Sequence, residues 1–178
     1  MLNVGDIAPK ISIPTDIGRF SLAEQGGKKV VVFFFPRADT SGCTKESIQF
    51  SELTDAFAAE NTVVIGISKD TPAKQAKFRK KYGLSCLLGA DHETEMCEKF
   101  GVWVEKSMYG KCYMGIQRAS FVINTDGKVV SSQQNVDGLH NCNTNTSDTV
   151  PEFQAQACAE AKGHWGATTD GARADHNR

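Results

Sequence analysis

The chain has 178 residues, a formal net charge of -1 and 40% hydrophobic residues. A chain of this length forms one domain that buries about 70% of the surface its unfolded state exposes, so it needs no disulfides or metals to fold. The near-zero charge argues against a nucleic acid or an anionic membrane as the main partner. The longest apolar run, Val30–Phe35, is far below the roughly 20 residues that span a bilayer.

The first residues and the cysteines indicate a reducing compartment. Residues 1–10 contain no charged segment followed by an apolar one, so no signal peptide is visible and we expect a cytoplasmic protein. The six cysteines contain no CxxC pair, which excludes the dithiol of a thioredoxin-type reductase and the usual zinc spacings. Most should be free thiols in the cytoplasm. They are Cys43, Cys86, Cys97, Cys112, Cys142 and Cys158.

The first predicted elements are a hairpin, a core strand and a long helix. Residues 4–20 have the Gly, Pro and Asp punctuation of short edge strands. Val30–Phe35 is a continuous run of β-branched and aromatic residues, typical of a strand buried on both faces in the middle of a sheet. A turn-rich loop follows. Phe50 and Phe57 then have the spacing of one helical face, which places Cys43 in the first turn of an amphipathic helix.

The middle of the chain predicts alternating strands and helices. Thr62–Ser68 is a second buried strand. Pro72 suits the first position of a helix, which Gly83 ends. Ser85–Leu88 predicts a short strand, and Glu93–Phe100 predicts a short helix.

The last regular elements form a hairpin. We expect Trp103–Gly115 to be a loop. Ala119–Asn124 and Lys128–Ser132 are strands, and Asp126-Gly127 between them is a strong hairpin turn signal. Strands that alternate with helices and close in a hairpin predict a mixed α/β sheet.

Cys43 is the first candidate functional residue. A helix N-terminus presents N–H groups without intrahelical partners and a partial positive charge, and both favour a thiolate, which is the nucleophilic form of cysteine. The alternative is that Cys43 is a small buried hydrophobic residue, as most free cysteines are. Position alone does not separate these two interpretations.

The residues before Cys43 resemble a known signature. Pro36, Thr40 and Cys43 have the spacing P-x-x-x-T-x-x-C at the end of the core strand, which resembles the active-site signature of the peroxiredoxins. The wider context, FFFPRADTSGCTKE with GVW and YMGIQRASFVINTDGK downstream, is similar to the bacterioferritin comigratory protein (peroxiredoxin Q) branch of that family. The similarity covers about residues 4–138.

This resemblance implies a fold and a domain division. Residues 1–138 are expected to form a thioredoxin-like domain, with a central mixed β-sheet flanked by helices and an N-terminal hairpin. Residues 139–178 are an atypical polar tail that does not match the family. Within this tail, the residues at about 149–162 have a capping box followed by helix-forming residues, so we expect one helix there.

The resemblance also implies a chemistry: reduction of hydrogen peroxide and organic hydroperoxides, with no metal, haem or flavin. The Cys43 thiolate attacks the terminal peroxide oxygen and becomes a sulfenic acid. The Thr40 hydroxyl, the Arg118 guanidinium and the backbone N–H groups of Gly42 and Cys43 are the implied peroxide ligands. Pro36 is implied to shape the loop and keep water off the sulfur.

Each of these residues also has a plainer interpretation. Thr40 suits a turn, Pro36 terminates a strand, and Arg118 could be a surface cation. Glu46, one turn into the helix, either orients Arg118 or interacts with the helix dipole. The combination at matching positions around one helix-opening cysteine favours the peroxidase site.

Regeneration is where the chain departs from its relatives. In many of them a resolving cysteine lies five residues after the first or in the next helix, and here those positions are Ile48 and Arg79. The resemblance therefore implies a one-cysteine enzyme, a monomer or weak homodimer, recycled by thioredoxin, glutaredoxin or glutathione. Two alternatives stay open: a displaced resolving cysteine among the other five, and a thiol-based redox sensor or holdase.

Overall fold

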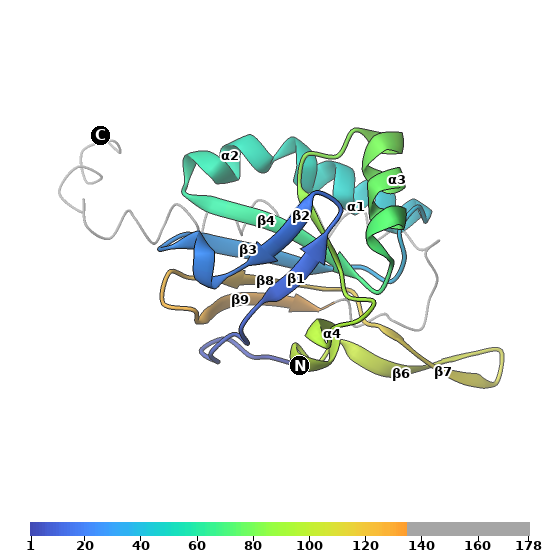
Figure 1. The fold of residues 1–178 in the computed structure, drawn as a ribbon. Helices are drawn as coiled ribbons and strands as arrows, with labels where there is room; N and C mark the ends of the chain where they lie inside the picture. The colour runs from blue at the N-terminus through green and yellow to red at the C-terminus, as the bar shows by residue number, and fades with distance from the viewer. Residues whose placement is uncertain (135–178) are drawn as a thin grey trace, which may run out of the picture.

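The computed structural model describes residues 1–134. Its centre is a seven-stranded mixed sheet with the strand order β2-β1-β5-β4-β3-β8-β9, and a separate two-stranded sheet, β6-β7, projects from one end (Figure 1). Three helices, α1, α2 and α3, cover one face of the large sheet, and α4 lies on the opposite side. The predicted domain boundary at residue 138 and the predicted tail helix lie outside the described residues.

The elements follow the chain in an alternating order that ends in a hairpin. They are β1 (Ser12–Thr15), β2 (Gly18–Ser21), a short 3-10 helix η1 (Ala23–Gln25), β3 (Lys29–Phe34), α1 (Ser41–Glu52), α2 (Thr54–Ala59), β4 (Thr62–Ser68), α3 (Pro72–Tyr82), β5 (Leu87–Ala90), α4 (Met96–Lys99), β6 (Trp103–Met108), β7 (Lys111–Ile116), β8 (Ala119–Ile123) and β9 (Val129–Gln134).

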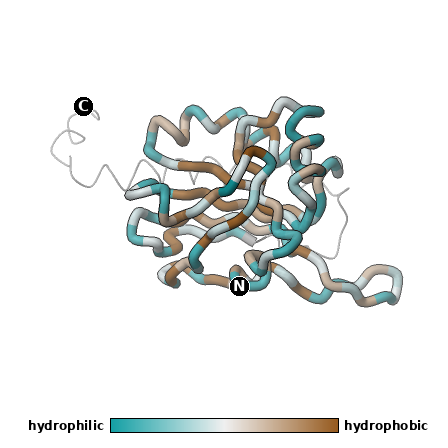
Figure 2. The backbone as a smooth tube through the Cα atoms, viewed as in Figure 1, coloured by the Kyte–Doolittle hydropathy of each residue, from teal (hydrophilic) through white to brown (hydrophobic). Residues whose placement is uncertain are grey.

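The strand β3 is central, as its uninterrupted apolar sequence predicts. It pairs in parallel with β4 and antiparallel with β8, and all six of its residues are buried. Since side chains alternate across a strand, Val32 and Phe34 face one core, while Val31 and Phe33 face the other, beneath the helices. The apolar colouring of Figure 2 is accordingly concentrated in the sheet.

The core beneath the helices is packed closely around Phe33. Its ring stacks on Phe50 of α1, with the ring centroids 4.3 Å apart. A Cβ at Gly66 of β4 would lie 2.4 Å from the Phe33 ring, so glycine is required at this position. This packing places α1 directly over the carboxyl end of β3.

Several predicted elements are confirmed. The N-terminal hairpin, the strand Thr62–Ser68 and the hairpin that closes the sheet are all present. The helix α3 begins at Pro72, where the Thr71 side chain accepts a bond from the Lys74 N–H, and it ends at Gly83 with φ 62°. These boundaries match local signals because a cap, a proline and a left-handed glycine are set by the chain itself.

Other boundaries differ from the predictions. The short strand is Leu87–Ala90 rather than Ser85–Leu88. The helix that was expected to run on past Phe50 breaks at Leu53 into α1 and α2.

The prediction of a loop over Trp103–Gly115 is wrong. These residues form the hairpin β6-β7, which places Cys112 in a strand. Most of its side chains are exposed, so the sequence carries no alternation of apolar and polar residues. Its turn uses Tyr109 and Gly110, both with positive φ, of 51° and 76°. That conformation fits a two-residue hairpin turn, but Tyr-Gly is not among its usual sequences.

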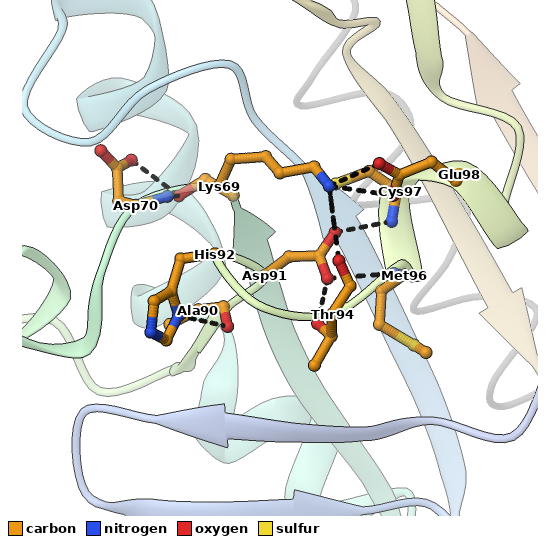
Figure 3. Close-up of polar contacts among 10 residues, drawn as sticks. Lys69, Asp70, Ala90, Asp91, His92, Thr94, Met96, Cys97 and Glu98 are labelled. Atoms are coloured by element: carbon orange, nitrogen blue, oxygen red, sulfur yellow. Dashed lines mark hydrogen bonds and ion pairs between the residues drawn. The ribbon is translucent and has the colours of Figure 1, made fainter.

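The predicted helix over Glu93–Phe100 is only one turn long because a buried carboxylate organises the residues before it (Figure 3). Asp91, with a fully buried side chain, accepts the N–H bonds of Met96 at 3.0 Å and Cys97 at 2.8 Å, as well as the Thr94 hydroxyl. The Lys69 ammonium lies 3.4 Å from it.

Replacing Asp91 with alanine should lower the free energy of unfolding by about 3 kcal/mol at pH 7, because two buried N–H groups lose their acceptor. Burial alone would raise the pKa of Asp91, but the Thr94 and backbone hydrogen bonds hold it below its ordinary value. The contribution of ionised Asp91 to the free energy of unfolding is therefore present above about pH 4 and is lost as the pH falls further.

Urea unfolding of wild type and Asp91→Ala at pH 7 and pH 3.5 measures this difference, which should narrow at the lower pH. Glu93→Ala is the matched control, since the Glu93 side chain is 81% exposed. Equal free energies of unfolding for Asp91→Ala and Glu93→Ala at pH 7 would contradict this stabilising role of Asp91.

Candidate active site

Cys43 lies in the first turn of α1, the helix that follows the central strand. Residues 36–40, here called the active-site loop, lie between β3 and α1, and Cys43 is the third residue of the helix. The residue has no exposed surface and belongs to the buried cluster beneath the helices, which also contains Phe33, Phe35 and Phe50. The N–H groups of Gly42 and Cys43 belong to the first helical turn and therefore have no acceptor within the helix.

Arg118 reaches Cys43 because of the register of two neighbouring strands. Phe34 at the end of β3 pairs with Ala119 at the start of β8, so the residue before β8 lies beside the active-site loop. Arg118 Nη2 donates a hydrogen bond to Cys43 Sγ at 3.1 Å. The sequence resemblance placed a cation near this thiol, and the structure brings the two side chains into contact.

Glu46 holds the other side of the Arg118 guanidinium. Its carboxylate accepts a hydrogen bond from Arg118 Nη1, and only 3% of its side chain is exposed. Burial raises the pKa of Glu46, against the attraction of Arg118. Burial alone would lower the pKa of Arg118, but Glu46 and the Cys43 sulfur hold it above its ordinary value. Arg118 is thus a fixed cation at the thiol, and Glu46 orients it.

Thr40 and Pro36 both belong to the active-site loop. Thr40 occupies the N-cap position of α1, but its side chain makes no capping bond. Its hydroxyl instead donates to the Arg37 carbonyl at 3.0 Å. Pro36 is half-buried. The residue before it, Phe35, donates its N–H to the Ile67 carbonyl at 3.0 Å.

Arg79 occupies the position where many relatives have a resolving cysteine in the second helix, and here it has a structural role. It pairs with Asp16 and donates to the carbonyls of Leu84 and Cys86. The other usual position, Ile48, is partly buried against the core beneath the helices.

The remaining described cysteines are free thiols. Cys86 is buried, with its sulfur 3.2 Å from Ser51 Oγ, and burial raises its pKa. Cys97 lies in the core on the opposite face of the sheet from Cys43, and burial together with Asp91 raises its pKa as well. Cys112 is exposed. Cys142 and Cys158 lie outside the described residues.

Two further residues support the loop and were not identified from the sequence as site residues. Asp70 accepts the Ala38 N–H at 2.7 Å, and Asp39 contacts the end of α3. Asp70 looks like an ordinary helix cap in the sequence, and no local pattern indicates that its carboxylate turns toward a loop 32 residues earlier in the chain.

Residues 4–132 match the AhpC/TSA family. The chain belongs to that family. It is 43% identical over 129 residues to peroxiredoxin Bcp of Escherichia coli K12, an alignment that covers 72% of this chain and 83% of the relative. The fold resembles that of peroxidoxin BcpB from Mycobacterium tuberculosis, with a TM-score of 0.73, 29% identity and coverage of 92% and 98% of the two chains.

A second solved structure is the Xanthomonas campestris bacterioferritin comigratory protein, with a TM-score of 0.74, 25% identity and coverage of 88% of this chain and 99% of that one. The resemblance to the bacterioferritin comigratory branch and the thioredoxin-like fold are therefore confirmed. This peroxiredoxin is a thiol peroxidase.

Within residues 1–134, no helix is long and apolar enough to cross a membrane. In the same part of the chain, no three His, Cys, Asp or Glu side chains are grouped so that they could hold a metal ion.

Proposed function

We propose that this peroxiredoxin reduces hydrogen peroxide and organic hydroperoxides through a sulfenic acid at Cys43, and that an external thiol regenerates it. The observation that carries the proposal is the 3.1 Å contact between Arg118 Nη2 and Cys43 Sγ at the N-terminus of α1. A fixed cation and a helix N-terminus both stabilise the thiolate, which is the nucleophile.

In the proposed reaction, the thiolate attacks the terminal oxygen of the hydroperoxide. A sulfur–oxygen bond forms while the oxygen–oxygen bond breaks, and the other oxygen leaves as hydroxide or alkoxide and takes up a proton. Negative charge moves from the sulfur toward the leaving oxygen, so donors fixed in advance lower the barrier. Arg118 and the N–H groups of Gly42 and Cys43 take this role, and Thr40 joins them by turning its hydroxyl away from Arg37.

Organic hydroperoxides are proposed as substrates for two reasons. The thiol belongs to the apolar core beneath the helices, so an alkyl group near the sulfur meets apolar side chains. The structure of the Xanthomonas campestris relative was described for its alkyl peroxide reduction activity.

Regeneration is proposed to be external because the two buried cysteines of residues 1–134 other than Cys43 are poor internal nucleophiles. Cys86 and Cys97 are buried thiols with raised pKa values, so they stay neutral near pH 7. A thiol from thioredoxin, glutaredoxin or glutathione attacks the sulfenic sulfur, forms a disulfide and releases water; a second thiol then frees Cys43. These reductants fit the cytoplasm, and a monomer or weak homodimer suffices for this cycle.

A variant that retains only Cys43 tests this cycle. With the other five cysteines replaced by serine or alanine, steady-state peroxide consumption should stay within about threefold of wild type both with dithiothreitol and with thioredoxin, since no internal disulfide takes part. Circular dichroism checks that the variant is folded.

Each alternative predicts a different result. A two-cysteine enzyme with a displaced resolving thiol loses turnover with thioredoxin in this variant, and restoring one cysteine at a time identifies the resolving residue. A sensor or holdase consumes about one equivalent of peroxide per chain in wild type and then stops, even with reductant present.

A further inference from the structure

The active-site loop is tied to both ends of α3. At the N-terminal end, Asp70 Oδ2 accepts the Ala38 N–H at 2.7 Å and the Ser68 hydroxyl at 2.7 Å. Asp70 precedes Thr71, the N-cap residue of α3. The loop is therefore held through the backbone N–H of Ala38, one residue before Asp39, whose φ is positive.

At the other end of α3, Asp39 accepts hydrogen bonds from two side chains. The Tyr82 hydroxyl donates to Asp39 Oδ1 at 2.6 Å, and the Lys81 ammonium lies 2.9 Å from Oδ2. The Tyr82 ring packs edge-on against Phe78, with the centroids 5.6 Å apart. We call Asp39, Lys81 and Tyr82 the Asp39 anchor.

The two donors of the Asp39 anchor differ in strength. The side chains of the Lys81–Asp39 ion pair are 57% and 44% exposed, so this pair is screened by water and contributes little. Tyr82 has few rotamers, and its ring is held by Phe78, so its hydroxyl is aimed at Asp39 with less loss of entropy. Tyr82 is therefore the stronger of the two contacts.

Asp39 has a left-handed backbone, with φ 62°. Aspartate adopts this conformation more readily than most residues, but it remains less favourable than the extended or helical regions. The next residue is Thr40, the N-cap of α1, three residues before Cys43. A rotation of the Asp39 backbone would move Thr40 and the first turn of α1 relative to Arg118, which is fixed from β8.

We propose that Asp39 is a positioning residue for the peroxidase site: bound by Tyr82 and Lys81, it keeps the loop in the conformation that aligns Thr40 and Cys43 with Arg118. This inference rests on the proposed function. It also predicts opposite effects on the two halves of the cycle. Cys43 has no exposed surface, so the larger reductant can reach its sulfur only when the loop moves, and the Asp39 anchor opposes that movement.

Asp39→Gly is the informative variant. Glycine adopts positive φ freely, so the backbone conformation stays accessible while the carboxylate is lost. The second-order rate constant for Cys43 oxidation by hydrogen peroxide should fall about tenfold, the size expected for one hydrogen bond to a charged group. The rate of sulfenic acid reduction by dithiothreitol should rise several-fold in the same variant.

Three further variants serve as controls. Asp39→Asn keeps an acceptor for Tyr82 and a side chain that tolerates positive φ, so it should restore rates close to wild type. Tyr82→Phe retains the ring packing and should reproduce most of the Asp39→Gly effect. Lys81→Met should have a smaller effect, and Lys80→Met, at an exposed neighbouring position, should have none.

Both half-reactions are measured in single turnovers, by quenching and quantifying oxidised Cys43 by mass spectrometry. Slower oxidation with faster reduction in Asp39→Gly, restored in Asp39→Asn, is the expected result. Unchanged rates overturn the inference, and so does an equal loss in both half-reactions, which indicates a general loss of structure. If wild-type Cys43 is not oxidised at all, the proposed function itself fails.

Discussion

Replacement of Cys43 by serine should abolish peroxide turnover and leave the fold intact, the largest effect expected in this chain. The serine hydroxyl is close in size to the thiol, so the packing of the core beneath the helices, to which Cys43 belongs, is kept. At neutral pH it is a far weaker nucleophile, and loss of a covalent nucleophile lowers the rate by more than about a thousandfold. The measurement is steady-state peroxide consumption with dithiothreitol, alongside circular dichroism.

Cys112→Ser is the matched control for Cys43→Ser, because Cys112 is an exposed thiol on the β6-β7 hairpin. It should retain wild-type turnover. Substantial activity in Cys43→Ser, or loss of activity in Cys112→Ser, would move the catalytic centre away from α1.

Replacement of Arg118 by alanine should slow the reaction with peroxide by on the order of a hundredfold, the usual loss when one donor to a developing charge is removed. Arg118 Nη2 is the group 3.1 Å from Cys43 Sγ, so the variant loses the donor that contacts the reacting sulfur itself. Alkylation of Cys43 by iodoacetamide at pH 7 should slow in the same variant. Arg118→Lys should recover only part of the rate. The planar guanidinium bonds Glu46 through Nη1 and Cys43 through Nη2, and the compact ammonium of lysine lacks this pair of fixed donors.

A double variant separates catalysis from stability in the Arg118 experiment. Arg118→Ala alone leaves the buried Glu46 carboxylate without its cation, which is destabilising. Adding Glu46→Gln removes that buried charge, so stability against urea should recover while the rate with peroxide stays low. A rate that recovers with stability would show that Arg118 acts only in folding, and an unchanged rate in Arg118→Ala would exclude it from the site.

The parts of the fold that the sequence predicts are those set by local chemistry. The run Val30–Phe35 could only be a buried strand, and α3 is bounded by a proline and a left-handed glycine that lie within it or next to it. The β6-β7 hairpin was missed because it is exposed and its turn, Tyr109-Gly110, has no usual hairpin sequence. The sequence did not predict the short length of α4, because it depends on the hydrogen bonds that the Asp91 carboxylate accepts from the Met96 and Cys97 N–H groups.

In the active site, too, the sequence predicts the local features but not the long-range contacts. The position of Cys43 in the first turn of a helix follows from the spacing of apolar residues after it. The contact with Arg118, 75 residues away in the chain, follows from the register between β3 and β8, which the sequence alone does not specify. The contact between Asp39 and Tyr82 is likewise long-range, and no motif marks either residue.

The most direct test of the central claim is a peptide map after oxidation with one equivalent of hydrogen peroxide in the presence of a dimedone-type probe. The probe reacts with sulfenic acids, and the map is run without reductant so that any disulfide is kept. We expect the adduct on Cys43, with the other five cysteines unmodified. An unmodified Cys43, or a disulfide that joins Cys43 to another cysteine of the same chain, would contradict the one-cysteine peroxidase described above.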